Sequence, residues 1–152
     1  MRTLGNILWH VPFLGFMNAL ATFLIGGLFV ITVIGAPIGL GLIQLSKFLL
    51  TPFSSGMINK RDLKPEQNQA WQTFGIIARI LYFPFGLILA VLTVFQIAGL
   101  FITIIGIPIA LVLAKSLGTF FNPVNKTCVS KAVADEVASR KAKAEVDKAF
   151  AS

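Results

Sequence analysis

Polar and apolar positions divide the chain into two long apolar blocks, a polar stretch between them and a polar tail. Residues 3–46 and 80–114 contain no Asp, Glu, Lys or Arg. A bilayer crossing needs about 20 apolar residues, whereas a surface helix of a soluble protein shows a polar face at every turn. The pattern therefore predicts a polytopic membrane protein built from helices.

The two apolar blocks repeat one another at a constant offset, which we call the repeat offset. Residues 31–38 read ITVIGAPI, and residues 102–109 read ITIIGIPI. The same offset relates Gly15 to Gly86, Thr22 to Thr93 and Pro52 to Pro123. A period this long, present in two copies, indicates a duplicated module.

A Gly-x-Pro sequence interrupts each block, because glycine leaves helical angles easily and proline lacks a backbone donor. We expect one hairpin from residues 13–34 and 37–50, and a second from residues 84–105 and 108–121. The returning segments have 14 residues each, about 21 Å if helical. They either just reach the membrane surface or are re-entrant among other protein segments.

The segments outside the blocks are polar or amphipathic. Residues 3–12, with Trp9 and His10, and residues 72–82 resemble segments at the membrane interface, where Trp and Tyr are enriched. In the tail, Val129, Val133 and Val137 have helical spacing. The tail helix is therefore either a solvated helix or a contact for an oligomer or for the anionic membrane face.

Positive residues flank both blocks and none lies near either break, so the positive-inside rule places both termini in the cytoplasm and the breaks on the far side. The two hairpins would then be parallel repeats. A kink at each break would invert the repeats, but the basic central loop argues against it. We expect an all-α polytopic membrane protein with two parallel repeats of a broken hairpin, an interfacial N-terminal segment and a cytoplasmic C-terminal helix. Its predicted parts are residues 1–57, 58–72, 73–125 and 126–152, the second being a polar cytoplasmic loop.

Three features resemble the YccF family of bacterial inner-membrane proteins. They are Met1-Arg2-Thr3 leading into Asn6-Ile7-Leu8-Trp9, the twin phrases at Gly35-Ala36-Pro37 and Gly106-Ile107-Pro108, and Pro52-Phe53. The resemblance covers about residues 1–125 and implies a duplicated domain in the bacterial inner membrane, without catalytic residues. The second copy departs from the pattern at Arg79-Ile80-Leu81-Tyr82, where the family has Asn-Ile-x-Trp, and at Val124.

Composition excludes several function classes. The net charge of +7 is spread along the chain without a basic stripe interleaved with aromatics, which argues against nucleic acid. Cys128 is the single cysteine, so no intramolecular disulfide or cysteine-based metal cluster is expected. The sequence has no phosphate-binding glycine loop, no Ser-His-Asp set and no metal-spaced cluster, so we expect no enzyme and no cofactor. A proton-driven transporter is disfavoured, because no ionisable group lies deep in either block.

Candidate site residues are the polar and helix-breaking positions inside the blocks. In a structural interpretation, the glycines turn the chain and the prolines begin the next helix. In a functional one, broken helices expose carbonyls that coordinate ions or polar groups, beside threonine and amide side chains that line a pore. The candidates are Thr32, Gly35, Pro37, Thr103, Gly106, Pro108, Asn18 and Gln96.

A ridge of small residues at four-residue spacing predicts close helix packing in lipid; alternatively, this face lines a conduit. Its members are Ala110, Ala114 and Gly118 in the last segment, and Gly39 begins the same ridge in the first repeat.

The leading hypothesis is a homo-oligomer in the lipid bilayer that forms a pore or channel for ions or small solutes, with both threonines and both breaks near the narrow part. The alternative is a non-conducting accessory or scaffold subunit that binds a partner membrane protein through its central loop and tail. A third hypothesis is a structural protein anchored to lipid by its basic cytoplasmic rim.

Overall fold

The computed structural model describes residues 2–11, 14–63 and 68–151, and most of them are helical. In chain order the elements are α1 (Arg2–His10), α2 (Gly15–Ile31), α3 (Ala36–Leu50), β1 (Ser55–Asn59), α4 (Lys60–Leu63), α5 (Gln69–Phe101), the 3₁₀ turn η1 (Ile104–Gly106), α6 (Ile107–Phe121), β2 (Lys126–Ser130) and α7 (Lys131–Phe150). The predicted all-α fold is wrong in one respect, because β1 and β2 form a two-stranded sheet.

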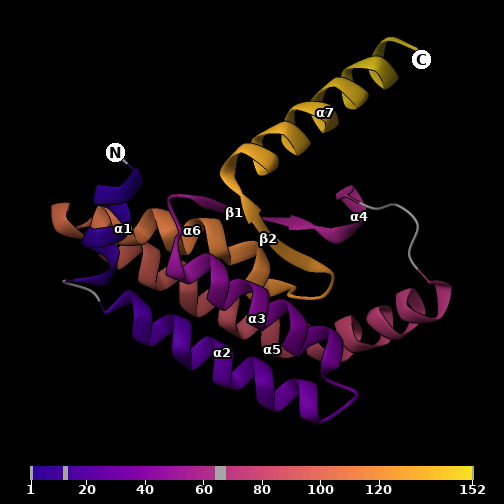
Figure 1. Ribbon diagram of the computed structural model, residues 1–152, viewed down its shortest axis with the longest axis horizontal. Helices are drawn as coiled ribbons and strands as arrows, with labels where there is room; N and C mark the ends of the chain where they lie inside the picture. Colours follow the sequence, from indigo (N-terminus) through magenta and orange to yellow (C-terminus); the bar gives the residue numbers. More distant parts are fainter. Residues whose placement is uncertain (1, 12–13, 64–67, 152) are drawn as a thin grey trace.

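The breaks in the apolar blocks lie where the sequence predicts them. α2 and α3 form one helical hairpin, and α5 and α6 form the other (Figure 1). Pro37 and Pro108 are the second residues of α3 and α6. The missing amide hydrogen is harmless there, because the first N–H groups of a helix have no partner within it.

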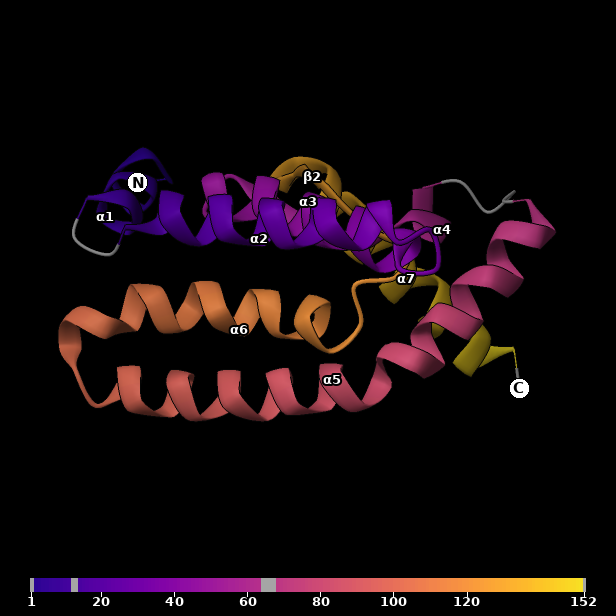
Figure 2. The same cartoon turned by 90° about the horizontal axis from the view of Figure 1, so that it is seen from below.

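Helix α5 is longer than the sequence predicts. Residues 72–82 were expected to form an interfacial segment separate from residues 84–105, but a single helix of 33 residues contains Pro84 and bends along its length (Figure 2). Proline inside a helix is a usual cause of such a bend. Among the described helices, α5 is the one long and apolar enough to cross a membrane, and α2, α3 and α6 are shorter apolar helices.

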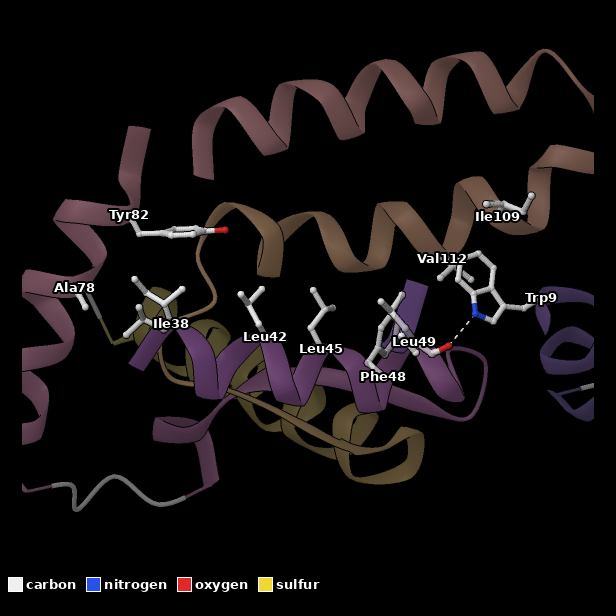
Figure 3. Packing of buried hydrophobic residues seen from close by; sticks show 12 residues of the cluster. Trp9, Ile38, Leu42, Leu45, Phe48, Leu49, Ala78, Tyr82, Ile109 and Val112 are labelled. Atoms are coloured by element: carbon white, nitrogen blue, oxygen red, sulfur yellow. Dashed lines mark hydrogen bonds between the residues drawn. The ribbon is translucent and has the colours of Figure 1, made fainter. Parts of the chain in front are cut away.

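Side-chain exposure separates the four apolar helices into an inner pair and an outer pair. Most of the apolar core lies on α3 and α6, with Trp9 packed at one end (Figure 3). In contrast, α2 and α5 expose most of their large apolar side chains, such as Leu28 and Phe95. An apolar surface of this extent is typical of a lipid-facing protein rather than a water-soluble one.

The sheet joins the ends of the two halves. β1 and β2 are antiparallel, with Met57 opposite Cys128 at the centre. Two reciprocal hydrogen bonds flank the pair, from the Lys60 amide to the Asn125 carbonyl (2.8 Å) and from the Lys131 amide to the Ser54 carbonyl (2.9 Å). β1 crosses the predicted boundary at residues 57/58, and α5 crosses the one at residues 72/73.

The bounds of the elements follow the repeat offset. It relates α3 to α6, β1 to β2, and the start of α4 to the start of α7. β1 and β2 occupy equivalent positions of the repeat and pair with each other in antiparallel orientation. The two halves are therefore related by an approximate two-fold rotation. The α2–α3 turn and the α5–α6 turn consequently lie at opposite ends of the helical body (Figures 1 and 2). The prediction of parallel hairpins is therefore wrong in their direction.

Helix α7 extends away from the helical body (Figure 1), and none of its described residues is buried. The predicted tail helix is thus present, although it begins after β2 rather than at residue 126. An ion pair of 2.7 Å between Lys141 and Asp62 connects α7 to α4.

Candidate functional site

A cavity of about 600 Å³ lies between the two halves, and we call it the interhairpin cleft. Its polar lining comes from α2 and α5 and comprises Asn18, Thr22, Thr93 and Gln96. The rest of the lining is apolar, including Trp9 and Phe120. The cleft therefore brings together Asn18 and Gln96, two of the predicted site residues, although they lie in different apolar blocks.

The lining of the cleft follows the repeat offset. Thr22 is equivalent to Thr93, Asn18 to Leu89 and Gln96 to Ile25, and all six residues line the cleft. A cavity whose two walls use equivalent positions lies on the approximate two-fold axis between the halves. Each wall carries one threonine and one amide, so the cleft presents similar chemistry on both sides.

The polar groups of the cleft are neutral. Thr22 Oγ1 donates to the Asn18 carbonyl, and Thr93 Oγ1 donates to the Leu89 carbonyl, both at 2.7 Å. The hydroxyl hydrogens are thus used within the helices, whereas the oxygen lone pairs can still accept. The side-chain amides of Asn18 and Gln96 make no hydrogen bond to the described part of the chain, and no charged residue is among those that line the cleft. The cleft can therefore bind water, a neutral solute or a cation through oxygen atoms.

Two smaller apolar cavities of about 310 and 370 Å³ continue the interhairpin cleft. The first shares Thr22 and Ile25 with the cleft, and the second shares Phe29 and Tyr82 with the first. Together they form a groove that ends at Thr32, beside the α2–α3 turn.

Thr32 and Thr103 occupy equivalent places in the two turns, and each stabilises its own turn. Thr32 Oγ1 donates to the Phe29 carbonyl at 2.7 Å, and Thr103 Oγ1 donates to the Leu100 carbonyl at 3.1 Å. Thr32 lines the end of the groove, whereas Thr103 is not among the residues that line the described cavities. The two threonines are not brought together, because the turns lie at opposite ends of the helical body (Figure 2).

The two breaks require glycine because neighbouring atoms leave no room for a Cβ atom at these positions. A Cβ atom on Gly35 would lie 2.6 Å from Thr32 Oγ1, and one on Gly106 would overlap Thr103 Oγ1 and the Leu100 carbonyl. These glycines, with Pro37 and Pro108, form the two turns, and none of their described contacts points to a ligand.

The small-residue ridge packs over only half of its length. Gly39 lies against the Gly26 carbonyl, and Ala110 is fully buried. Ala114 and Gly118 are exposed, and a Cβ on Gly118 would meet open space. These two residues do not pack against another helix within the chain, and their predicted packing role in lipid stays a prediction. A four-residue step advances about 40° around a helix of 3.6 residues per turn, so the ridge rotates away from the core.

Trp9 and Tyr82 join the helical layers near the bases of the hairpins. Trp9 Nε1 donates to the Leu49 carbonyl at 2.8 Å (Figure 3), and Tyr82 Oη donates to the Phe120 carbonyl at 3.1 Å. The two carbonyls are equivalent positions of the repeat. Trp9 is only 2 % exposed, so the predicted interfacial role gives way to a packing role. The Asn6 side chain adds contacts to the Phe53 amide and to Ser54 Oγ.

Sequence reasoning missed two parts of the site. Thr22 and Thr93 were noted only as markers of the repeat, although a polar residue repeated inside both apolar blocks is itself a signal. A polar pocket lined by Asn59, Arg61, Asp62, Arg79 and Asn125 was not anticipated. Its residues are distant in sequence and come together only through the β1–β2 pair.

The family model of the inner membrane component domain YccF matches residues 4–55. No curated protein and no solved structure matches the chain. The matched range contains the whole α2–α3 hairpin, together with Trp9, Asn6 and the Gly35 break. The family resemblance seen in the sequence is confirmed over residues 4–55, which match the inner membrane component domain of the YccF family.

Proposed function

We propose that this inner-membrane protein assembles as a homo-oligomer and conducts ions or small solutes through the interhairpin cleft. The observation that carries the proposal is the meeting of four uncharged polar side chains, Asn18, Thr22, Thr93 and Gln96, in one cavity between two apolar hairpins.

The position of the cleft supports this proposal. We infer that the halves are two copies of one module, because their elements, their strand pairing and their cleft-lining residues all follow one offset. In membrane transporters built from repeats, the substrate site lies at the interface between the repeats. The interhairpin cleft occupies the corresponding place here.

The sheet side of the molecule carries positive charge and is assigned to the cytoplasm. Lys115 Nζ lies 5.4 Å from the centre of the Phe53 ring, next to β1, and Lys47 is close enough to Cys128 in β2 to affect its ionisation. Cytoplasmic segments of membrane proteins are enriched in such residues.

Unsatisfied amides in lipid argue for water or a second copy of the chain in the cleft. A polar group without a partner in hydrocarbon costs several kcal/mol, and the Asn18 and Gln96 side chains are exposed in the single chain. A homo-oligomer that covers the apolar faces of α2 and α5 would close the cleft and keep its polar groups hydrated.

The test is ion and solute flux through purified protein in liposomes, with empty vesicles as the blank. Thr93→Val removes a cleft hydroxyl at nearly constant volume, and Thr103→Val is the matched control outside the cleft. Loss of one polar contact of about 1 kcal/mol changes a rate roughly five-fold. We expect that reduction for Thr93→Val and wild-type flux for Thr103→Val. Absence of flux for every ion and solute tested would refute the conduit.

The second candidate function is an accessory or scaffold subunit, and the exposed helix α7 favours it. A cavity of about 580 Å³ lies between α4 and α7, lined by apolar side chains such as Val133 and Val137 beside Asp62 and Lys141. A partner membrane protein could be held there through mixed apolar and charged contacts. Deletion of residues 131–152 leaves both strands in place. Under this hypothesis it abolishes cross-linking to the partner in membranes, and under the conduit hypothesis it leaves flux unchanged.

A further inference from the structure

A small polar pocket lies beside the sheet, away from the interhairpin cleft. It has a volume of about 120 Å³ and is lined by Asn59 and Arg61 near the end of β1, Asp62 of α4, Arg79 of α5, and Asn125 before β2. We call it the Arg61–Arg79 pocket. Its space equals that of about four water molecules in the liquid, which suits one tetrahedral oxyanion.

The Arg61–Arg79 pocket has an excess of positive charge. Its one carboxylate, Asp62, pairs with Lys141 at 2.7 Å, and the Asp62 side chain is only 17 % exposed. Arg61 and Arg79 form no ion pair with the described part of the chain. Lys126 lies close by: burial lowers its pKa, and the charges of Lys141 and Arg79 lower it further, against the opposing effect of Asp62.

The guanidinium of Arg79 is held in place. With the Asn122 amide oriented so that its oxygen faces the guanidinium, Arg79 Nη2 and Nε donate to it at 2.7 and 2.9 Å. This contact leaves Nη1 available to a ligand. Asn125 has a left-handed backbone (φ 61°), which asparagine tolerates better than most residues, and its carbonyl accepts from Lys60. The turn that carries Asn125 is therefore fixed against β1.

The equivalent positions of the other repeat carry no charge. At the repeat offset, Arg79 corresponds to Leu8, Arg61 to Ala132 and Asp62 to Val133. The repeated fold can therefore be built without the arginines, so their presence is not explained by the architecture of the hairpin.

If α5 crosses the bilayer with residues 80–101 in the hydrocarbon core, Arg79 lies at the depth of the lipid headgroups. The part of α5 after it, residues 80–101, is uncharged and about 33 Å long, which matches the hydrocarbon core of a bilayer. Arginine forms bidentate hydrogen bonds with phosphate oxygens. Two arginines and two asparagine amides around an oxyanion-sized space at this depth are suited to a phosphate group.

We propose that the Arg61–Arg79 pocket binds a phosphate oxyanion, supplied by the headgroup of an anionic phospholipid or by free phosphate. The site is separate from the conduit, and its test measures binding rather than flux, so the two proposals stand or fall independently.

The experiment measures ligand binding to the full-length protein in a neutral detergent, from the shift of its thermal midpoint during titration. One arm uses short-chain phosphatidic acid, a second uses inorganic phosphate, and a third uses short-chain phosphatidylcholine as the zwitterionic reference. Arg61→Gln leaves the Arg79–Asn122 contact intact, and Arg79→Lys keeps the charge without the bidentate geometry. Arg140→Gln, on exposed α7, is the control that removes one positive charge elsewhere.

We expect saturable binding of phosphatidic acid that weakens about tenfold in Arg61→Gln and in Arg79→Lys, but not in Arg140→Gln. Binding should also weaken as salt rises, because opposite charges are screened. Binding of phosphatidic acid without binding of phosphate identifies a lipid headgroup site, and binding of both identifies a general oxyanion site. Equal binding of phosphatidylcholine, or equal loss in Arg140→Gln, overturns the proposal, as does unchanged binding in Arg61→Gln.

Discussion

Met57 and Cys128 lie opposite each other at the centre of the β1–β2 pair and occupy equivalent positions of the sequence repeat. The Cys128 amide donates to Gln44 Oε1 at 3.2 Å, and therefore points away from β1. In an antiparallel sheet this marks a non-hydrogen-bonded pair, whose Cα atoms lie about 4.5 Å apart. Met57 and Cys128 are thus equivalent residues of the two halves, and they contact each other at the centre of the sheet that joins the halves.

This pairing predicts that Met57→Cys forms a disulfide with Cys128 on mild oxidation, because the expected Cα separation lies within the range of disulfides. Ile58→Cys is the control, since its side chain points to the other face of the sheet. After cleavage in the central loop, the two fragments of Met57→Cys should stay linked on a non-reducing gel and separate on reduction. Separate fragments without reduction would show that the strands pair in another register.

A second prediction concerns the contact between α1 and α2. A Cβ atom on Gly15 would overlap the indole ring of Trp9, whereas one on Gly27 of the same helix meets no atom within 4 Å. Gly15→Ala should lower the free energy of unfolding by about 1–3 kcal/mol through overpacking. Gly27→Ala should leave it unchanged or raise it by up to about 1 kcal/mol, because alanine favours a helix.

Thermal unfolding of both variants in detergent measures this difference. Equal midpoints for Gly15→Ala and Gly27→Ala would mean that the Trp9 ring does not pack on Gly15.

The hairpins could be predicted from the sequence because their signals are local. Uninterrupted apolar residues mark the helices, and a glycine followed by a proline marks each turn, so Pro37 and Pro108 begin α3 and α6 as expected. The family could also be identified, because Asn6-Ile7-Leu8-Trp9, Gly35-Ala36-Pro37 and Pro52-Phe53 lie within the segment of residues 4–55 that the family model matches. The second phrase, at residues 106–108, lies outside that segment.

The sheet and the cleft could not be predicted, because both depend on contacts between distant residues. β1 has five residues, SGMIN, without a clear apolar alternation, and its partner strand lies in the other half of the chain. Asn18 and Gln96 were recognised as polar groups in apolar blocks, but only the two-fold relation between the halves places them in one cavity. The same rotation places Thr32 and Thr103 at opposite ends of the helical body. Their equivalent positions in the sequence had suggested that they lie together.

A third prediction tests the hydrogen bond at the base of the second hairpin. Tyr82→Phe removes the hydroxyl that donates to the Phe120 carbonyl at 3.1 Å and keeps the ring. The free energy of unfolding should fall by about 1 kcal/mol, the usual net value of one such bond. Trp71→Phe, at a more exposed position of α5, is the comparison and should have a smaller effect. A Tyr82→Phe protein as stable as wild type would indicate that water replaces the hydroxyl.

The last prediction concerns the thiol of Cys128. Burial raises its pKa, an effect that the Ser55 hydrogen bond and the charge of Lys47 only partly oppose. The thiolate is the reactive form of cysteine, so at any pH near 8 the folded protein should hold less thiolate than an exposed cysteine does. As the pH rises to the ordinary pKa of cysteine, the thiol of the unfolded chain loses its proton before the thiol of the folded chain does. Stability that is present at lower pH should therefore decline as the pH rises.

The measurement is the rate of reaction with a disulfide reagent from pH 7 to pH 10. The control carries Ala151→Cys on the exposed end of α7 in a Cys128→Ser background. Cys128 should react more slowly than the control at every pH in the folded protein, and at a similar rate after unfolding in denaturing detergent. Because the pKa of Cys128 is the higher one, its rate should also keep rising at pH values where the control has levelled off. Matching rates in the folded state would mean that the Cys128 thiol is open to solvent at the centre of the β1–β2 pair.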